Sequence, residues 1–159
     1  MITINEKYTV ETVFMKEEYF PIKVCLNNYI DNIKYIQYEK DEYNMLEFTL
    51  NRTTNEFYRL QLVIGNTFTV VDEVLTPVNN FTEGIAVFKT PEVIKTSRLD
   101  VIVYSNGVEI VLSDSPASTW LKTGSVLFGL NSDNELSLIR IIDLTADERQ
   151  HILDELTLV

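Results

Sequence analysis

The sequence predicts a mostly β fold with one short helix at its C-terminal end. Three observations lead to this prediction: apolar and polar residues alternate with period two over many short stretches, turn-forming residues separate these stretches, and a helical pattern occurs only after residue 144. We expect about ten antiparallel strands in two similar β-units of one domain, residues 1–80 and residues 81–159.

Two stretches of the chain have similar sequences, which we call the repeated motif. LEFTLNRTTNEFYRLQLVI spans residues 46–64, and VLFGLNSDNELSLIRIIDL spans residues 126–144. When Phe48 is aligned with Phe128, a Leu-Asn pair and, after a one-residue gap, an Asn-Glu pair coincide. Each copy reads as apolar stretch, polar turn and apolar stretch, which is the pattern of a β-hairpin. The self-similarity indicates repeated units, and two unrelated hairpins are the alternative.

The likeness extends upstream of these hairpins. YIDNIKYI, residues 29–36, resembles YSNGVEIV, residues 104–111. In the second copy Asn106-Gly107 is a strong hairpin signal, because both residues tolerate a positive φ. Asp31-Asn32 occupies the same place in the first copy and is the next best pair for that geometry. We therefore expect a second matched pair of hairpins.

Further upstream, TVETVF, residues 9–14, aligns with EGIAVF, residues 83–88. The second half then has an additional segment, DSPASTWLKTG, residues 114–124, which we interpret as a longer loop. It carries the chain's single tryptophan, Trp120. A tryptophan in a polar loop either covers an edge of the core or anchors an interface, and the sequence leaves both readings open.

The last residues predict the one helix. Thr145 and Glu148 have the spacing of a capping box, in which each side chain satisfies a backbone N–H of the other residue. Ile152, Leu153 and Leu156 follow at helical spacing and form a short apolar stripe. We expect the helix to start after Thr145 and to place this stripe against the sheets.

The charge balance restricts the classes of partner. The chain has 13 Lys and Arg against 24 Asp and Glu, which gives a formal net charge of −11. Binding to a phosphate backbone needs clustered cations, so we exclude a nucleic-acid partner. The field of the acids would instead attract a basic protein over a Debye length of about 10 Å. Solubility alone is the plainer explanation of the same charge.

Patterns of export and of membrane insertion are missing. The single cysteine, Cys25, cannot form an internal disulfide, and MITINEKYTVETVF has no basic segment followed by an apolar run. No apolar stretch approaches the roughly 18 residues that a membrane helix needs. We therefore expect a cytoplasmic protein without membrane contact.

Catalytic and metal-binding patterns are weak. We interpret the one thiol, Cys25, as a core residue and the one histidine, His151, as a surface residue. Two such ligands are too few for a structural zinc site, and the five glycines fit no phosphate-binding or nucleophile motif. Glu56 and Glu135 would be related by the repeat, but both fall at turn ends. We predict no catalytic residue, no metal site and no cofactor.

Tyrosine distinguishes the two halves. Residues 1–80 hold twelve aromatic residues and residues 81–159 hold five. Tyrosine is enriched in recognition surfaces, and here it alternates with acids in KEEYF and YIQYEKDEY. The alternative is that strands simply favour Tyr and that loops favour Glu. The predicted partner-binding residues are Tyr35, Tyr38, Glu39, Asp41, Glu42, Tyr43, Glu17, Glu18 and Tyr19.

These observations favour a non-enzymatic, acidic recognition protein. Our leading hypothesis is an inhibitor or immunity-type protein that occludes a more basic partner protein, with tyrosines as anchors and carboxylates that steer association. The first alternative is a structural or assembly protein of a phage or secretion system, which would pack against copies of itself, for example as a homodimer. The second is a small-ligand binder or carboxylate-based enzyme with a cleft between the two halves.

Overall fold

The computed structural model describes residues 1–65 and 67–156. The prediction of a mostly β fold with one short C-terminal helix is confirmed, although the described strands number 15 rather than about ten. The elements are β1 Ile2–Asn5, β2 Thr12–Phe14, β3 Ile22–Leu26, β4 Ile33–Asp41, β5 Asn44–Asn51, β6 Phe57–Gly65, β7 Phe68–Val70, β8 Thr82–Glu83, β9 Ile85–Phe88, β10 Val93–Lys95, β11 Asp100–Val103, β12 Val108–Val111, β13 Thr119–Thr123, β14 Val126–Leu130, β15 Leu136–Ile141 and α1 Ala146–Leu156.

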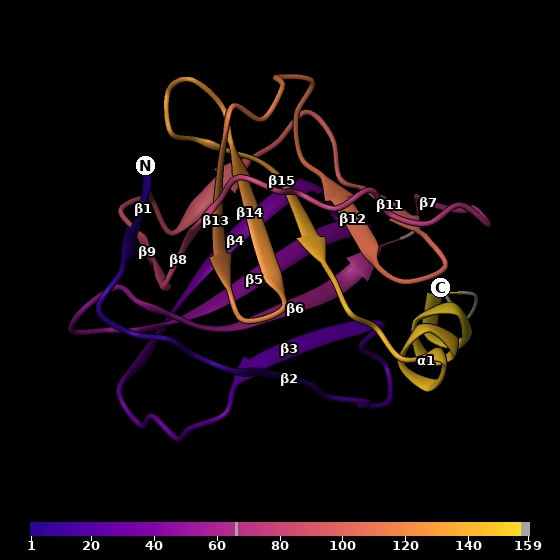
Figure 1. The fold of residues 1–159 in the computed structure, drawn as a ribbon, viewed down its shortest axis with the longest axis horizontal. Coiled ribbons are helices and arrows are strands. Elements are labelled where there is room, and N and C mark those ends of the chain that lie inside the picture. Colours follow the sequence, from indigo (N-terminus) through magenta and orange to yellow (C-terminus); the bar gives the residue numbers. More distant parts are fainter. Residues whose placement is uncertain (66, 157–159) are drawn as a thin grey trace.

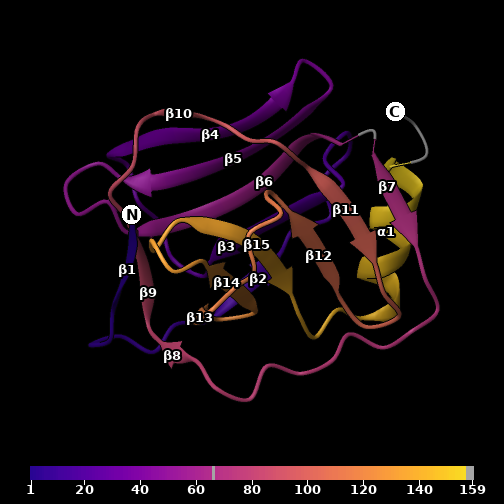
Figure 2. The ribbon, with the colours of Figure 1, turned by 90° about the horizontal axis from the view of Figure 1, so that it is seen from above.

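Two large sheets pack face to face (Figures 1 and 2). The first has the strand order β10-β4-β5-β6-β3-β2, and the second has the order β7-β11-β12-β15-β14-β13-β8. A two-stranded ribbon, β1 with β9, lies at the end of the molecule away from α1 (Figure 1). One hydrophobic cluster contains residues of both sheets and of α1, so the halves share a core.

Five consecutive strands in each half have the same arrangement. In the first sheet β2 to β6 lie in the order β4-β5-β6-β3-β2, and in the second sheet β11 to β15 lie in the order β13-β14-β15-β12-β11. Every pairing among these ten strands is antiparallel in both units. β4 therefore corresponds to β13, and β2 corresponds to β11.

The repeated motif forms the central hairpin of each unit, as predicted. β5 pairs with β6 and β14 pairs with β15, with a register shift at Thr49/Leu50 in one hairpin and at Gly129/Leu130 in the other. These two bulges lie at the same place when Phe48 is aligned with Phe128. Both copies of the repeated motif thus form the same two strands and the same β-bulge, which bends them.

Asn55 and Asn134, which are aligned in the two copies of the repeated motif, have a structural role. Asn55 has a φ of 61° and Asn134 a φ of 59°, a left-handed conformation that asparagine tolerates better than most residues. Their carbonyl groups accept hydrogen bonds from Phe88 N–H (3.0 Å) and Ile2 N–H (3.1 Å), respectively. Phe88 and Ile2 are themselves opposite each other in the β1–β9 ribbon. Each hairpin loop thus holds one strand of this ribbon.

The upstream alignment was wrong by one strand. Residues 29–36 form no hairpin, because β3 pairs with β2 and β6 while β4 pairs with β5 and β10. The turn at Asn106-Gly107 does join β11 to β12, but neither residue has a positive φ. Residues 83–88 form β8 and β9 rather than a counterpart of β2. The counterpart of β4 is β13, in the segment that the sequence indicated as a loop.

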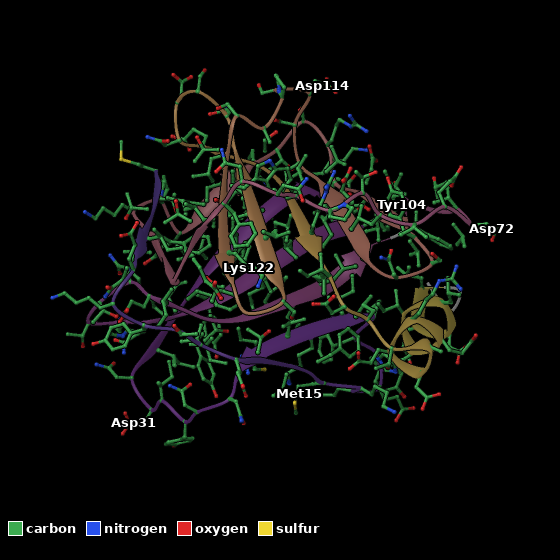
Figure 3. The ribbon with its side chains drawn as sticks, in the orientation of Figure 1. Met15, Asp31, Asp72, Tyr104, Asp114 and Lys122 are labelled. Atoms are coloured by element: carbon green, nitrogen blue, oxygen red, sulfur yellow. The ribbon has the colours of Figure 1, made fainter. Side chains whose placement is uncertain are left out.

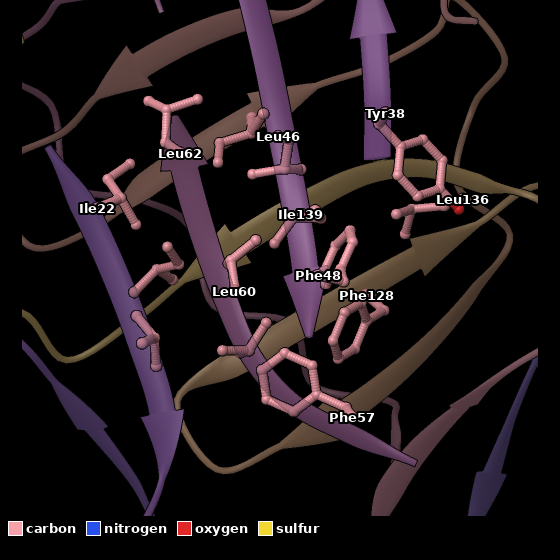
Figure 4. Packing of buried hydrophobic residues seen from close by; sticks show 14 of the residues in the cluster. Ile22, Tyr38, Leu46, Phe48, Phe57, Leu60, Leu62, Phe128, Leu136 and Ile139 are labelled. Carbon is pink, nitrogen blue, oxygen red and sulfur yellow. The ribbon is translucent and has the colours of Figure 1, made fainter. Parts of the chain in front are cut away.

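Four phenylalanines form the centre of the shared core. Phe48, Phe57, Phe88 and Phe128 are each at most 1% exposed. The ring centroids of Phe48 and Phe128, one from each sheet, are 6.2 Å apart, and Phe88 lies 4.7 Å from Phe48 and 5.7 Å from Phe128. Figure 4 shows Phe48, Phe57 and Phe128 of this cluster between the sheets. Burial of each ring contributes about 1.5–3 kcal/mol to stability.

Three short strands cover edges of the five-stranded units. β10 pairs with β4, β8 with β13 and β7 with β11, and all three pairings are parallel, contrary to the prediction of antiparallel strands only. β7 belongs to residues 1–80 but joins the second sheet, and β10 belongs to residues 81–159 but joins the first. Among the described residues, no strand pairs with the remaining edge, that of β2.

The helix α1 begins with the predicted capping box. Thr145 N–H donates to Glu148 Oε1 (3.0 Å), and Glu148 N–H donates to Thr145 Oγ1 (3.2 Å). Ile152 and Leu156 are buried, and Leu153 packs partly against the core. The helix lies across one end of the two sheets (Figure 1).

Candidate functional site

Tyr38 is not a surface residue. Along β4, Ile36 and Tyr38 face the core with 1% and 3% exposure, whereas Tyr35 is 46% exposed on the outer side of the sheet. The ring of Tyr38 packs edge-on against Phe48 at 5.6 Å, and its burial raises the pKa of the phenol. The prediction of Tyr38 as a partner anchor is therefore wrong, because the alternation of the strand assigns it to the face that the second sheet covers.

Two predicted acids are engaged in local structure. Glu39 forms an ion pair with Lys95 of the covering strand β10. Asp41 Oδ1 accepts hydrogen bonds from Tyr43 N–H (2.8 Å) and Asn44 Nδ2 (3.0 Å), and these bonds lower the pKa of Asp41. Both acids hold the end of β4 in place. Asp41 remains exposed, and the next two residues of this turn, Glu42 and Tyr43, are exposed as well, the latter to 56%.

The turn between β2 and β3 presents a strained tyrosine. Tyr19 has a φ of 71°, a conformation that costs an aromatic residue about 1–2 kcal/mol, and its side chain is 74% exposed. Glu18 is exposed beside it, and Glu17 forms an ion pair with Lys23. The corresponding turn of the second unit, residues 104–107, is shorter than residues 15–21. The additional residues carry this acidic, tyrosine-bearing tip.

Contacts from α1 fix the Tyr19 turn. Glu155 Oε2 accepts a hydrogen bond from the Tyr19 backbone N–H at 3.1 Å. His151 Nε2 donates to the Phe20 carbonyl at 3.0 Å, and the His151 ring packs edge-on against Phe14. His151 is therefore half-buried rather than a plain surface residue, and it supports the turn. The backbone strain at Tyr19 is maintained by these contacts, and strain of this kind is concentrated at functional sites.

The Tyr19 and Tyr43 turns lie at the same end of the first sheet. β4 ends at Asp41, and β3 begins at Ile22, which is opposite Leu62 near the end of β6. Three strand spacings separate the turns, which is roughly 14 Å. Figure 2 shows the β4–β5 turn and α1 at one end of the molecule. We call this surface the acidic end: Glu17, Glu18, Tyr19, Asp41, Glu42, Tyr43, Asp154 and Glu155.

Lysines moderate the charge of the acidic end without cancelling it. Lys16 and Lys40 are exposed nearby, and Lys23 is paired with Glu17. The last turn of α1 contains acids and no base. Acids there oppose the helix dipole at a cost of about 0.3–1 kcal/mol each. Asp154 Oδ1 accepts a hydrogen bond from Gln150 Nε2 within α1 (2.8 Å), whereas Glu155 accepts one from the Tyr19 backbone N–H. Glu155 therefore serves the Tyr19 turn rather than the helix end.

Tyr35 and two further tyrosines lie away from the acidic end. Tyr35 and Tyr43 are eight residues apart, and the strand between Tyr35 and Asp41 alone spans roughly 20 Å. Tyr29 is 84% exposed and Tyr8 is 52% exposed, and the sequence reasoning singled out neither. Tyr29 belongs to the β3–β4 connection, whose Asp31 lies at the opposite end of the molecule from α1 (Figure 3). Exposure of tyrosine alone does not identify a site.

Trp120 covers an outer face rather than projecting from a loop. It lies in β13 opposite Gly129, where an added Cβ would come within 3.1 Å of the indole ring. The Arg140 guanidinium is 5.0 Å from the Trp120 ring centroid and also donates to Glu109 at 2.9 Å. The indole is half-buried. These contacts favour the covering role over the interface role.

The described residues bring together no catalytic pair from the sequence candidates. Cys25 is buried on β3, and desolvation raises the pKa of its thiol, which makes it a poor nucleophile. Glu56 accepts a hydrogen bond from Asn5, and Glu135 is exposed. Within residues 1–65 and 67–156, no group of three His, Cys, Asp or Glu side chains could hold a metal ion.

No protein-family model matches the chain, and no curated protein matches it. The described helix α1 is too short and too polar to span a membrane.

Proposed function

We propose that this chain is a non-enzymatic protein-binding module of the inhibitor or immunity type, which occludes a more basic partner protein through its acidic end. The observation that carries the proposal is Tyr19. It is 74% exposed in a turn that is longer than its counterpart, it is held in a strained conformation, and a helix supports it. A turn without function would not retain this cost of about 1–2 kcal/mol.

The physical roles divide between rings and carboxylates. Tyr19 and Tyr43 offer large, rigid contact surfaces that lose little entropy when they bind. Glu18 and Glu42 are exposed beside them and supply a negative field within the overall charge of −11. Such a field increases the association rate with a basic protein and sets its orientation, while the desolvated rings determine the lifetime of the complex.

The test uses the protein product of a gene adjacent to the one that encodes this chain, because inhibitors and their targets are often encoded together. Co-purification and surface plasmon resonance establish the complex and its Kd. Tyr19→Ala and Tyr43→Ala should each weaken binding by about 2 kcal/mol or more, as central anchors do. Tyr29→Ala is the matched control, because Tyr29 is 84% exposed but at the other end, and it should change Kd little.

The charge contribution is measured by stopped flow at two salt concentrations. E18Q/E42Q should slow association at low salt, with the difference disappearing at high salt because ions screen exposed charges. E92Q/D133N removes the same charge from exposed positions elsewhere. Equal effects of the two double variants, or an effect of Tyr29→Ala as large as that of Tyr19→Ala, would contradict the proposal.

A further inference from the structure

The uncovered edge of β2 is the feature that breaks the correspondence between the two units. β4, β13 and β11 each carry a short parallel strand on their outer edge. β2 corresponds to β11 in strand order, yet no described strand of the chain lies on its outer edge. The arrangement therefore contains four equivalent edge positions, of which three are occupied from within the chain.

The backbone of β2 directs hydrogen-bonding groups toward this position. Met15 N–H donates to Lys23 O and Asn27 N–H donates to Glu11 O, so the residues bonded to β3 are the odd-numbered ones. The N–H and C=O groups of Thr12 and Phe14 then point away from β3. In β11 the corresponding groups are used: Val101 N–H donates to Thr67 O, and Val103 O accepts from Val71 N–H.

The surface beside β2 is hollowed and negatively charged. A hollow of about 320 Å³ is lined by β2, by residues 141–144 and by Glu148. A second hollow of about 360 Å³ continues from it toward residues 9–11, Glu83, Lys122 and Gly124. The contact between Thr12 and Ser125 lies between them, with 2.6 Å between the hydroxyl oxygens. Among the described residues that line the two hollows, Glu11, Glu83, Asp143 and Glu148 are acidic, and Lys122 is the one cation.

From these observations we infer that β2 is a strand-addition site for an extended, basic segment of the partner protein. The segment pairs in parallel with Thr12–Phe14, as the three internal covering strands do with their edges. Its backbone supplies the hydrogen bonds, and its Lys or Arg side chains face the carboxylates of the hollows. The inference rests on the proposed function for the basic class of partner, and it adds a second surface that adjoins the acidic end.

The probe is a synthetic seven-residue peptide of alternating Lys and Val, capped at both ends. Its binding to the ¹⁵N-labelled protein is followed by NMR and by amide hydrogen exchange. At saturation the exchange of Thr12 N–H and Phe14 N–H should slow by about tenfold or more, while Val13 N–H, already bonded to β3, should change little. The same peptide with alternate amides N-methylated should lose this protection, and so should a Glu-Val peptide.

A charge variant tests the hollows without disturbing the fold. In E11Q/D143N/E148Q, Gln at position 148 keeps the capping box, and Asn at position 143 tolerates the φ of 59° found there. This variant should bind the Lys-Val peptide about tenfold more weakly at low salt. The matched control E73Q/E92Q/D133N changes the net charge equally at exposed positions elsewhere. An equal loss in both variants overturns the role of the hollows.

The remaining outcomes separate the competing explanations. Binding that is unaffected by N-methylation, or absence of binding, overturns strand addition. Shifts confined to Tyr19 and Tyr43 also overturn it but leave the proposed function intact, because a basic ligand would then bind the acidic end. Protection of Thr12 and Phe14 that grows with protein concentration without peptide overturns the assignment to a partner segment, because a second copy of the chain then occupies the edge. The Tyr19→Ala measurement above tests the proposed function independently of all these results.

Discussion

The contact between Phe48 and Phe128 predicts that the two β-units unfold as one. These residues come from different sheets, are fully buried, and have ring centroids 6.2 Å apart. Replacing either phenylalanine by alanine would cost about 3–5 kcal/mol, which is comparable with the whole stability of a small protein. Phe→Leu is gentler, and we expect each such variant to lose about 1–3 kcal/mol. Their common contact should make the double variant more stable than additivity predicts by about 0.5–1.5 kcal/mol.

Urea unfolding monitored by two signals measures this coupling. Far-UV circular dichroism reports on all strands, whereas the fluorescence of Trp120, the single tryptophan, reports on the second sheet. Phe48→Leu, in the first sheet, should lower the midpoints of both signals equally. Phe14→Leu combined with Phe128→Leu is the control, because the described ring contact of Phe14 is with His151, and this pair should be additive within about 0.5 kcal/mol. If Phe48→Leu left the Trp120 transition unchanged, the units would be separate folding domains and the reasoning would fail.

Two further predictions concern the hairpin loops and the buried tyrosine. Because Asn55 and Asn134 have positive φ, Asn→Ala at either position should lower the free energy of unfolding, measured in urea, by about 1 kcal/mol. Asn→Gly should be nearly neutral. Equal effects of Ala and Gly would show that backbone conformation is not the cause. The folded-state pKa of Tyr38 is raised above its unfolded value of about 10, so the stability contributed by the neutral phenol is present below pH 10 and is lost as the pH rises toward the folded-state pKa. The urea midpoint should therefore fall between pH 9 and pH 11 more steeply for the wild type than for Tyr38→Phe, and identical slopes would contradict this.

Local patterns predicted the parts of the fold that local interactions determine. The hairpins at 46–64 and 126–144 and the capping box of α1 depend on residues a few positions apart, and all are present. The partners of edge strands depend on contacts distant in the chain. The Asp31-Asn32 pair resembled a hairpin turn, but β5 and β6 lie between β4 and β3 in the sheet, so the intervening residues form a crossing connection instead. An origin of the two units by duplication stays a prediction.

The sequence predicted most of the tyrosines and acids of the candidate site, but it did not predict how they are arranged in space. The sequence could not assign Tyr38 to the core, because alternation along β4 leaves open which face the second sheet covers until the register is known. It also could not show that Glu155, 136 residues after Tyr19, holds that tyrosine in place. One signal was nevertheless present in the sequence: the last turn of α1 contains acids and no base, an arrangement that opposes the helix dipole unless other contacts offset it.

The first unit differs from the second in the uncovered edge of β2 and in the long Tyr19 turn, and these two features adjoin each other. The edge strand β2 ends at Phe14, and the Tyr19 turn begins at the next residue. α1 borders both features, since Glu148 lines the hollow beside β2 and Glu155 bonds the Tyr19 backbone. In the second unit the corresponding edge is covered by β7 and the corresponding turn is short. A basic partner that added a strand to β2 would therefore meet Tyr19 where that strand ends, so the two proposed contacts belong to one continuous interface along β2 and α1.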